Sequence, residues 1–258
     1  MIGVEIERSE QGIATVWLDN PRHKNALTNA MIVGLTEAFA ALGADASCRA
    51  IVLRGRGGVF CAGRELRDVR ALQEAGGDEV ERVYLTTQAM NEAIYDVPHP
   101  VVAVVEKYAL GIACMLASWS DIAIAEEGAL LGYPEVHHGI APYGAVPTML
   151  NTMSQKALLD LLLTGRRVDA AEAVRLGLVS RCIPADSLQA ELDAVLADIL
   201  RGSADAIRRS KRFVRECETR SYREGIAAAT AKAIEGISSP DMKQGLAAFV
   251  ARSKPPWR

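Results

Sequence analysis

Three glycine-containing turns, each following an apolar run, carry the residues best suited to chemistry. They are 59–66 (Val-Phe-Cys-Ala-Gly-Arg-Glu-Leu), 108–115 (Tyr-Ala-Leu-Gly-Ile-Ala-Cys-Met) and 132–136 (Gly-Tyr-Pro-Glu-Val). A helix pattern begins at Ile112, and a helix N-terminus offers unpaired N–H donors and a dipole that favours negative charge. One such turn is weak evidence, since glycine turns are common in α/β proteins. Together and in this order, they indicate one specific kind of site.

Other motifs are excluded by their spacing. Arg54–Gly58 follows a strand, but it lacks a third glycine, a helix that opens on it and a following GKS or GKT, so we interpret it as a plain glycine turn. No GxSxG or HExxH occurs. His137 and His138 adjoin Glu135, but neighbouring side chains diverge, so no metal site is expected there and both histidines are expected to be satisfied or exposed.

Composition narrows the function further. The 258 residues include 29 Lys plus Arg and 32 Asp plus Glu, a formal net charge of −3, and 5% aromatic residues. Such balanced charge argues against nucleic acid or a membrane surface as partner. Five scattered cysteines without a CxxC pair indicate reduced thiols. No stretch has the length of a signal-peptide core or a membrane helix, so we expect a soluble cytoplasmic protein.

The elements that must position the turns follow from periodicity. Residues 4–8 and 13–18 alternate as in a hairpin, and short apolar runs at 50–54, 101–105 and 121–125 indicate further strands. Helical patterns lie at 29–42, at 66–95 with a break at Gly76-Gly77, and at 112–119. Strands that alternate with helices predict an α/β fold with crossover connections.

The character of the sequence changes after Gly144. The segment 178–183 is the only strand candidate from there to the end, and the last 60 residues are expected to be helical. They contain a basic run at 208–212, which we interpret as a solvated helix face rather than a phosphate or nucleic-acid patch.

Over nearly its whole length the sequence resembles the enoyl-CoA hydratase/isomerase family, or crotonase superfamily. The matching segments are Asn20–Leu27, Val59–Leu66, Pro100–Asp121, Thr164–Val179 and Ser239–Phe249, with Glu65 where the family has aspartate. The resemblance implies a ββα-spiral catalytic core over residues 1–197 and a helical C-terminal segment over 198–258 that assembles a homotrimer or a dimer of trimers. Subunit contacts are expected over 222–249.

In this family, two backbone N–H groups hold the enolate-like oxygen of an acyl-CoA thioester. The resemblance places these donors at Arg64 and Ile112. Both positions depart from the pattern, because Arg64 replaces a small residue and Gly111-Ile112-Ala113 replaces three glycines. Backbone donors survive side-chain changes, so the oxyanion hole can persist. The Arg64 side chain is left to contact an acyl carboxylate or a CoA phosphate, or to lie at the surface.

The acid/base positions bear on the reaction. Family hydratases use two glutamates, of which one is matched by Glu135 and the other falls on Met115, which transfers no proton. Isomerisation of a 3-enoyl to a 2-enoyl thioester needs one base, so it is preferred over hydration. A carboxylate in an apolar cleft also has its pKa raised toward the useful range. Tyr143 lies where some relatives place a second acidic group and is a candidate to hold water or an enolate.

Two alternatives stay open: a 2-enoyl-CoA hydratase or hydratase-like lyase with a tyrosine-held water, and a CoA-thioester binding protein without catalysis. No metal or redox cofactor is implied, because CoA enters with the substrate. The cysteines at 61 and 114 are expected to line the site or lie in the core. The resemblance suggests a further set of substrate-binding residues, with the last two near the adenine: Lys24, Asn25, Ala26, Ala62, Leu66, Gly111, Met115, Phe249 and Arg252.

Overall fold

Six strands form the main sheet of the protein. The computed structural model describes residues 3–257. The strand order is β1-β2-β3-β4-β6-β9, in which β1 and β2 form the predicted antiparallel hairpin and every other neighbouring pair is parallel. The strands are β1 (Gly3–Arg8), β2 (Ile13–Asp19), β3 (Ala50–Gly55), β4 (Val101–Val105), β6 (Ile122–Glu126) and β9 (Arg181–Ile183).

A second, three-stranded sheet was not predicted from the sequence. It joins β5 (Tyr108–Leu110), β7 (Leu130–Gly132) and β8 (Arg167–Asp169), with β7 between the other two. The prediction of a single strand beyond Gly144 is therefore wrong. The strand β8 is three residues long, with Val168 buried between two exposed residues, so its alternation is too short for a sequence pattern to reveal.

Helices surround the two sheets. Helix α1 connects β2 to β3, helices α2 and α3 connect β3 to β4, and α4 lies between β4 and β6. These crossover connections between parallel strands agree with the predicted alternation. The α-helices are α1 (Asn29–Ala44), α2 (Leu66–Glu74), α3 (Gly77–Asp96), α4 (Ile112–Trp119), α5 (Ala145–Met149), α6 (Gln155–Thr164), α7 (Ala170–Leu176), α8 (Leu188–Leu200), α9 (Ala204–Cys217), α10 (Tyr222–Gly236) and α11 (Pro240–Val250). Four short 3-10 helices are η1 (Pro21–His23), η2 (Arg56–Gly58), η3 (Pro134–His138) and η4 (Ala185–Ser187).

The central strands β3 and β4 are buried on both faces of the main sheet, which explains why they are continuous apolar runs. Alternate residues such as Val52 and Val104 face α8, where they meet Leu192 in one cluster. Their neighbours, such as Leu53, belong to the larger core that packs against α1, α3 and α4. The core therefore fixes the carboxyl ends of these strands, where the turns begin.

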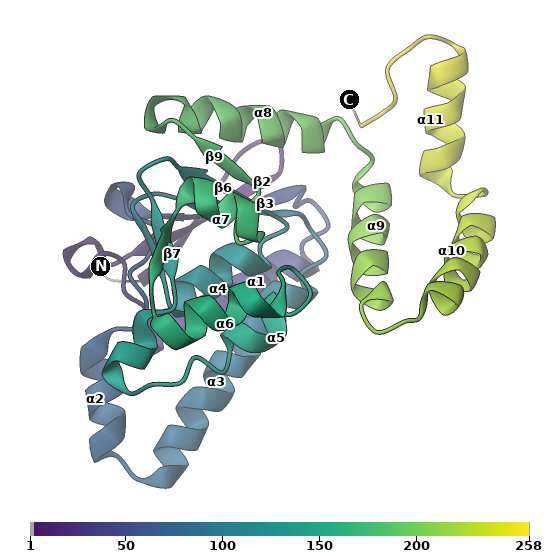
Figure 1. Cartoon of the computed structure of the whole chain (residues 1–258). Coiled ribbons are helices and arrows are strands. Elements are labelled where there is room, and N and C mark those ends of the chain that lie inside the picture. Colours follow the sequence, from purple (N-terminus) through teal and green to yellow (C-terminus); the bar gives the residue numbers. More distant parts are fainter. Residues whose placement is uncertain (1–2, 258) are drawn as a thin grey trace.

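The last three helices are set apart from the core. In Figure 1, α9, α10 and α11 extend to one side of the two sheets, and the prediction of a wholly helical C-terminal segment is confirmed. Helix α8 runs through the expected boundary at residue 197 and ends at Leu200. Across residues 3–257, no helix has the length and apolar character needed to span a bilayer.

Helix α9 is tied to the core by a buried charge. The Lys211 ammonium donates to the Asp121 Oδ2 at 2.6 Å and to the His99 carbonyl at 2.9 Å, and its side chain is 11% exposed. Burial lowers the pKa of Lys211, while Asp121 opposes the shift. The interpretation of the basic run as a solvated face is therefore wrong for Lys211, since a linear pattern does not show what α9 packs against.

Candidate functional site

The first two glycine turns lie against each other. The Cys61 N–H donates to the Tyr108 carbonyl at 3.0 Å, and the Leu110 N–H donates back to the Cys61 carbonyl at 3.4 Å. A side chain at Gly63 would begin 3.1 Å from the Leu110 carbonyl oxygen, so the two backbones nearly touch. This pairing brings together the residues that follow each glycine.

Two backbone donors at this junction are free. On one side of the first turn, the Leu27 N–H donates to the Gly63 carbonyl at 2.8 Å, and the Leu27 carbonyl accepts from the Glu65 N–H at 2.9 Å. The N–H of Arg64 therefore points to the opposite side, as in any parallel bridge. Ile112 is the first residue of α4, where no intrahelical acceptor exists. Neither N–H has a hydrogen-bond partner within residues 3–257.

Glu135 stands directly over the second turn. A methyl group at Gly111 would lie 3.0 Å from the Glu135 Cδ and would overlap its Oε1. The Glu135 Oε2 is buried and has no hydrogen-bond partner in the described part of the chain. Burial raises the pKa of Glu135, opposed only by a hydrogen bond to its own backbone. A carboxylate with a raised pKa is a stronger base than a solvated one, which suits a group that must accept and return a proton.

The third turn is held by the C-terminal end of α6. The Gly111 N–H donates to the Gly132 carbonyl at 2.9 Å, which ties the second turn to the strand before Glu135. On the other side, the His137 Nε2 lies 2.8 Å from the Thr164 carbonyl oxygen. His137 is thus satisfied, as expected, and it fixes the short helix that presents Glu135.

Met115 and Tyr143 take different places. Met115, one turn into α4, is 7% exposed, and its Cε and Sδ pack where a side chain at Gly144 would begin. It fills its position with apolar atoms. The Tyr143 side chain is 82% exposed, and it forms no side-chain hydrogen bond with any residue that the structure describes. The structure does not join Tyr143 to Glu135.

The early loop lies beside the first turn. The Ala62 N–H donates to the Lys24 carbonyl at 3.0 Å, and the Lys24 ammonium lies 5.0 Å from the Tyr108 ring centroid. Asn25 is fully buried, and its amide group bonds the Asn20 N–H at 2.8 Å and the Val59 carbonyl at 2.6 Å. Asn25 therefore shapes the loop from within.

The other expected binding residues are spread over the chain. Ala26 is buried and Leu66 is 67% exposed at the start of α2. Phe249 is 81% exposed on α11, and Arg252 follows that helix. Figure 1 shows α11 apart from α4, so one chain alone does not bring these last two residues to Glu135.

One pair at the site was missed by sequence reasoning. The Glu65 carboxylate caps the start of α2 by accepting from the Arg67 N–H, and it also pairs with the His23 Nδ1. The hydrogen bond to His23 is the main cause that lowers the pKa of Glu65. The replacement of aspartate by glutamate was the only signal, because the longer side chain reaches the early loop.

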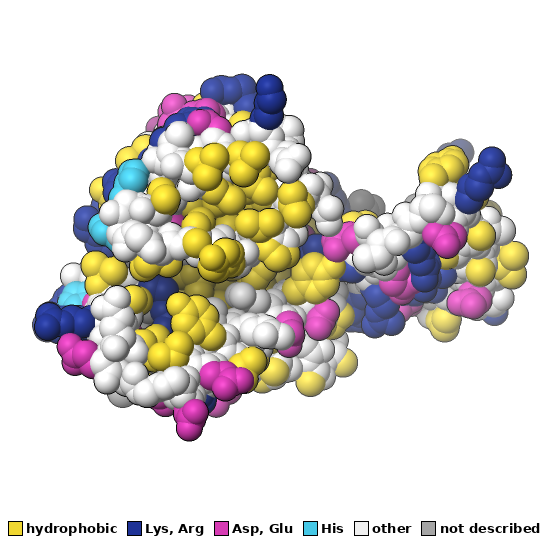
Figure 2. Space-filling model, turned by 60° about the horizontal axis from the view of Figure 1, so that its bottom comes forward, with side chains coloured by type: hydrophobic (Ala, Val, Ile, Leu, Met, Phe, Trp, Pro, Cys, Tyr) yellow, Lys and Arg dark blue, Asp and Glu magenta, His cyan; other side chains and the backbone are white. Residues whose placement is uncertain are grey.

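Apolar side chains gather around a hollow on the face that carries α2, α3, α5 and α6. Figure 2 views this face and shows hydrophobic side chains lining the hollow, with Lys or Arg side chains recessed within it. Large exposed apolar residues on these helices include Leu66, Tyr84, Leu85, Leu159 and Leu163. A surface of this kind suits a hydrocarbon chain.

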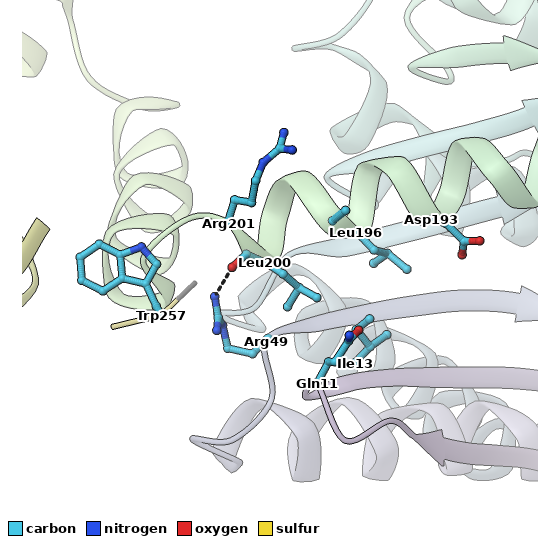
Figure 3. Close-up of a pocket in the computed structure, with 9 residues that line it drawn as sticks. Gln11, Ile13, Arg49, Asp193, Leu196, Leu200, Arg201 and Trp257 are labelled. Carbon is cyan, nitrogen blue, oxygen red and sulfur yellow. Dashed lines mark hydrogen bonds between the residues drawn. The ribbon is translucent and has the colours of Figure 1, made fainter. Parts of the chain in front are cut away.

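A separate cavity of about 570 Å³ lies at the C-terminal end of α8. It is lined by Gln11, Ile13, Arg49, Asp193, Leu196, Ala197, Leu200, Arg201 and Trp257. Figure 3 shows the Arg49 guanidinium donating to the Leu200 carbonyl, at 3.2 Å, and a second bond of 2.8 Å runs to the Gly202 carbonyl. Arg49 caps the helix there, and none of the expected site residues lines this cavity.

Two cysteines lie on the glycine turns of the site. Cys61 and Cys114 are fully buried, and burial raises the pKa of each to about 12. This agrees with the expectation that they are core or lining residues. All five cysteines of the chain are free.

Known proteins match this chain over almost its full length. The family model described as "Enoyl-CoA hydratase/isomerase" matches residues 8–258. A Mycobacterium bovis protein named "Probable enoyl-CoA hydratase echA8" is 33% identical over 251 residues, which cover 97% of this chain and 95% of the relative. The crystal structure of an enoyl-CoA hydratase from Mycobacterium smegmatis superposes with a TM-score of 0.93 at 29% identity, and that of Pseudomonas aeruginosa AtuE with 0.93 at 32%; each comparison covers 98% of both chains.

Proposed function

The chain belongs to the enoyl-CoA hydratase/isomerase family, and on that premise we propose that it is an acyl-CoA enzyme that converts 3-enoyl to 2-enoyl thioesters. The observation that carries the proposal is Glu135, a buried carboxylate whose Oε2 has no partner among the described residues and whose pKa is raised. Met115 occupies the position of a second carboxylate with apolar atoms. One base without a second acid suits a proton shuttle.

In the proposed reaction, the thioester oxygen accepts hydrogen bonds from the N–H groups of Arg64 and Ile112. Glu135 takes a proton from C2, and the electron pair delocalises onto the thioester oxygen as a dienolate. The same carboxyl group then returns the proton to C4, which moves the double bond into conjugation. The dipole of α4 and the two donors stabilise the charge that develops on the oxygen, and one such donor typically contributes about 3–4 kcal/mol.

Hydration of a 2-enoyl thioester is the second candidate, because the relatives carry the names of hydratases. Such a reaction needs a group that orients water besides Glu135. Tyr143 is exposed, and no hydrogen bond joins its hydroxyl group to Glu135, which favours isomerisation. A thioester-binding protein without catalysis is the third outcome of the experiment below.

The assembly belongs to the same proposal. The exposed apolar side chains of the last three helices include Tyr222, Ile226, Ile234, Ile237, Leu246 and Phe249. An apolar set of this size on helices that leave the core suits contact between copies of the chain, as a homotrimer or a dimer of trimers. We place the enzyme in the cytoplasm, without a metal or redox cofactor.

The deciding experiment offers purified protein 3-enoyl-CoA and 2-enoyl-CoA separately. Isomerisation increases the absorbance of the conjugated thioester without a change in mass, whereas hydration adds the mass of one water. Glu135→Gln should lower kcat for the 3-enoyl substrate by about 10²–10⁴-fold. Glu127→Gln, at an exposed glutamate, is the matched control and should retain activity.

Each contrary result has a clear meaning. Water addition without isomerisation would replace the first candidate by the second. Binding of both thioesters without turnover would support the non-catalytic alternative. Full activity of the Glu135→Gln variant would remove Glu135 as the base.

A further inference from the structure

The side chain of Arg64 is half-buried beside the candidate site and lacks a charged partner. Its guanidinium donates to the Asn29 Oδ1 at 2.7 Å and approaches the Thr87 Oγ1 at 3.4 Å, and both acceptors are neutral. It forms no ion pair with a carboxylate anywhere in residues 3–257. By contrast, Arg54, whose side chain is 19% exposed, bonds both oxygens of Glu106 at 2.8 and 3.0 Å.

This arrangement is costly for the protein alone. A buried charge is normally paired, because removing it from water is unfavourable. Burial is the main cause that lowers the pKa of Arg64, and the nearby Asp68 only opposes it. The Asp68 carboxylate already accepts from the Asn29 N–H at 2.6 Å. A guanidinium has five N–H donors, so Arg64 keeps donors available for an anion.

The position of Arg64 indicates which part of a substrate the anion belongs to. Its backbone N–H is one of the two proposed thioester donors, so its side chain begins at the reacting carbonyl. From there it runs to the first turn of α1, at Asn29, and to α3, at Thr87. The exposed apolar side chains Tyr84 and Leu85 belong to the same stretch of α3. The acyl chain of a substrate suits such apolar surroundings, whereas the CoA phosphates are better bound by basic side chains at the solvent-exposed surface.

We propose that Arg64 is a specificity-determining residue that selects acyl-CoA substrates whose acyl chain carries a carboxylate. The inference rests on the proposed function, since it assigns the acyl group that the same site takes. A planar guanidinium can donate two parallel N–H bonds to the two oxygens of a carboxylate, whereas a neutral hydrocarbon end offers no acceptor.

The test compares two thioesters of equal length, 3-hexenoyl-CoA and its analogue with a terminal carboxylate in place of the methyl group. The wild-type protein should prefer the carboxylated substrate in kcat/KM. Arg64→Met should reduce that preference by about 10–100-fold, the value of a hydrogen-bonded charge pair. Arg64→Lys should restore part of it, and Arg70→Met, at an exposed arginine of α2, should leave it unchanged.

Thioesters of N-acetylcysteamine, which lack the CoA phosphates, separate the two sources of an anion. A preference that persists with them supports an acyl carboxylate. A loss in Arg64→Met that is equal for both acyl groups, and that disappears without the phosphates, would assign Arg64 to CoA and overturn the proposal. An equal loss with every thioester would reduce Arg64 to a structural role. If the wild type turns over no substrate, the proposed function fails, and the same preference is then measured in dissociation constants by calorimetry.

Discussion

Gly111→Ala tests the geometry of the site most directly. Gly111 has φ +57° and ψ −124°, a conformation that L-residues rarely adopt, and its Cα lies under the Glu135 carboxyl group. The substitution adds one methyl group and leaves the charge and the donors of the site unchanged. It therefore acts on the position of Glu135 and on backbone strain alone.

The magnitude follows from two distances. The new methyl carbon would lie 3.0 Å from the Glu135 Cδ. Two carbon atoms pack at about 3.5–4.0 Å, so the carboxyl group must move by about 0.5–1 Å. A misplacement of about 1 Å can cost about 10²-fold in rate, so we expect kcat to fall by about 10–100-fold. Backbone strain should cost about 1–3 kcal/mol of unfolding free energy.

The assay measures kcat for 3-enoyl-CoA together with urea unfolding. Gly57→Ala is the matched control, because Gly57 also has a positive φ, +70°, but a side chain there would meet only the Pro21 Cβ at an ordinary 3.6 Å. The control should lose stability and keep kcat. The expected loss in kcat is about 10–100-fold. A folded Gly111→Ala protein whose kcat stays within about threefold of wild type would therefore refute the placement of Glu135 over Gly111.

Two further predictions concern charge. The pKa of Glu135 is raised above 4.5 by burial, so the rate should fall as the pH drops through that raised pKa. The folded protein also holds this proton more tightly than the unfolded chain, so the stabilising contribution is present at low pH and lost as the pH rises through the folded pKa. Glu135→Gln should thus raise Tm at neutral pH and lose that gain below the unfolded pKa; calorimetry that finds no gain at neutral pH would contradict this. Asp121→Ala leaves Lys211 with the His99 carbonyl alone and should lower the unfolding free energy by about 1–3 kcal/mol in urea. Adding Lys211→Met should cost less than the sum of the single changes, and strict additivity would contradict the pairing.

The fold was predictable wherever an element buries a regular stripe or a continuous run. The hairpin at 4–18, the helix that begins at Asn29 and the strand at 101–105 all show such patterns, and the α/β class follows from their alternation. The three-residue strand β8 carries too short a pattern to be seen. Lys211 was misread because its partner Asp121 lies on a distant segment of the chain, which one sequence does not connect to it.

The site was predictable as a set of turns but not as an arrangement. The helix pattern that begins at Ile112 indicates an unpaired N–H there, and the family resemblance implies its role as a thioester donor. What the sequence could not show is contact in space, such as Glu135 above Gly111 or His23 on Glu65. The sequence also could not show that Tyr143 is exposed. Its separation from Glu135 along the chain fits a shared site, but its side chain faces solvent.

The buried thiols beside the two donors have a consequence for the lifetime of the substrate. Thioesters transfer their acyl group to thiolates, and Cys61 and Cys114 flank the turns where the thioester carbonyl is proposed to lie. Burial raises the pKa of both thiols, which favours the neutral thiol over the nucleophilic thiolate at both positions. A thioester bound as proposed would therefore lie next to two sulfur atoms that are poor acyl acceptors.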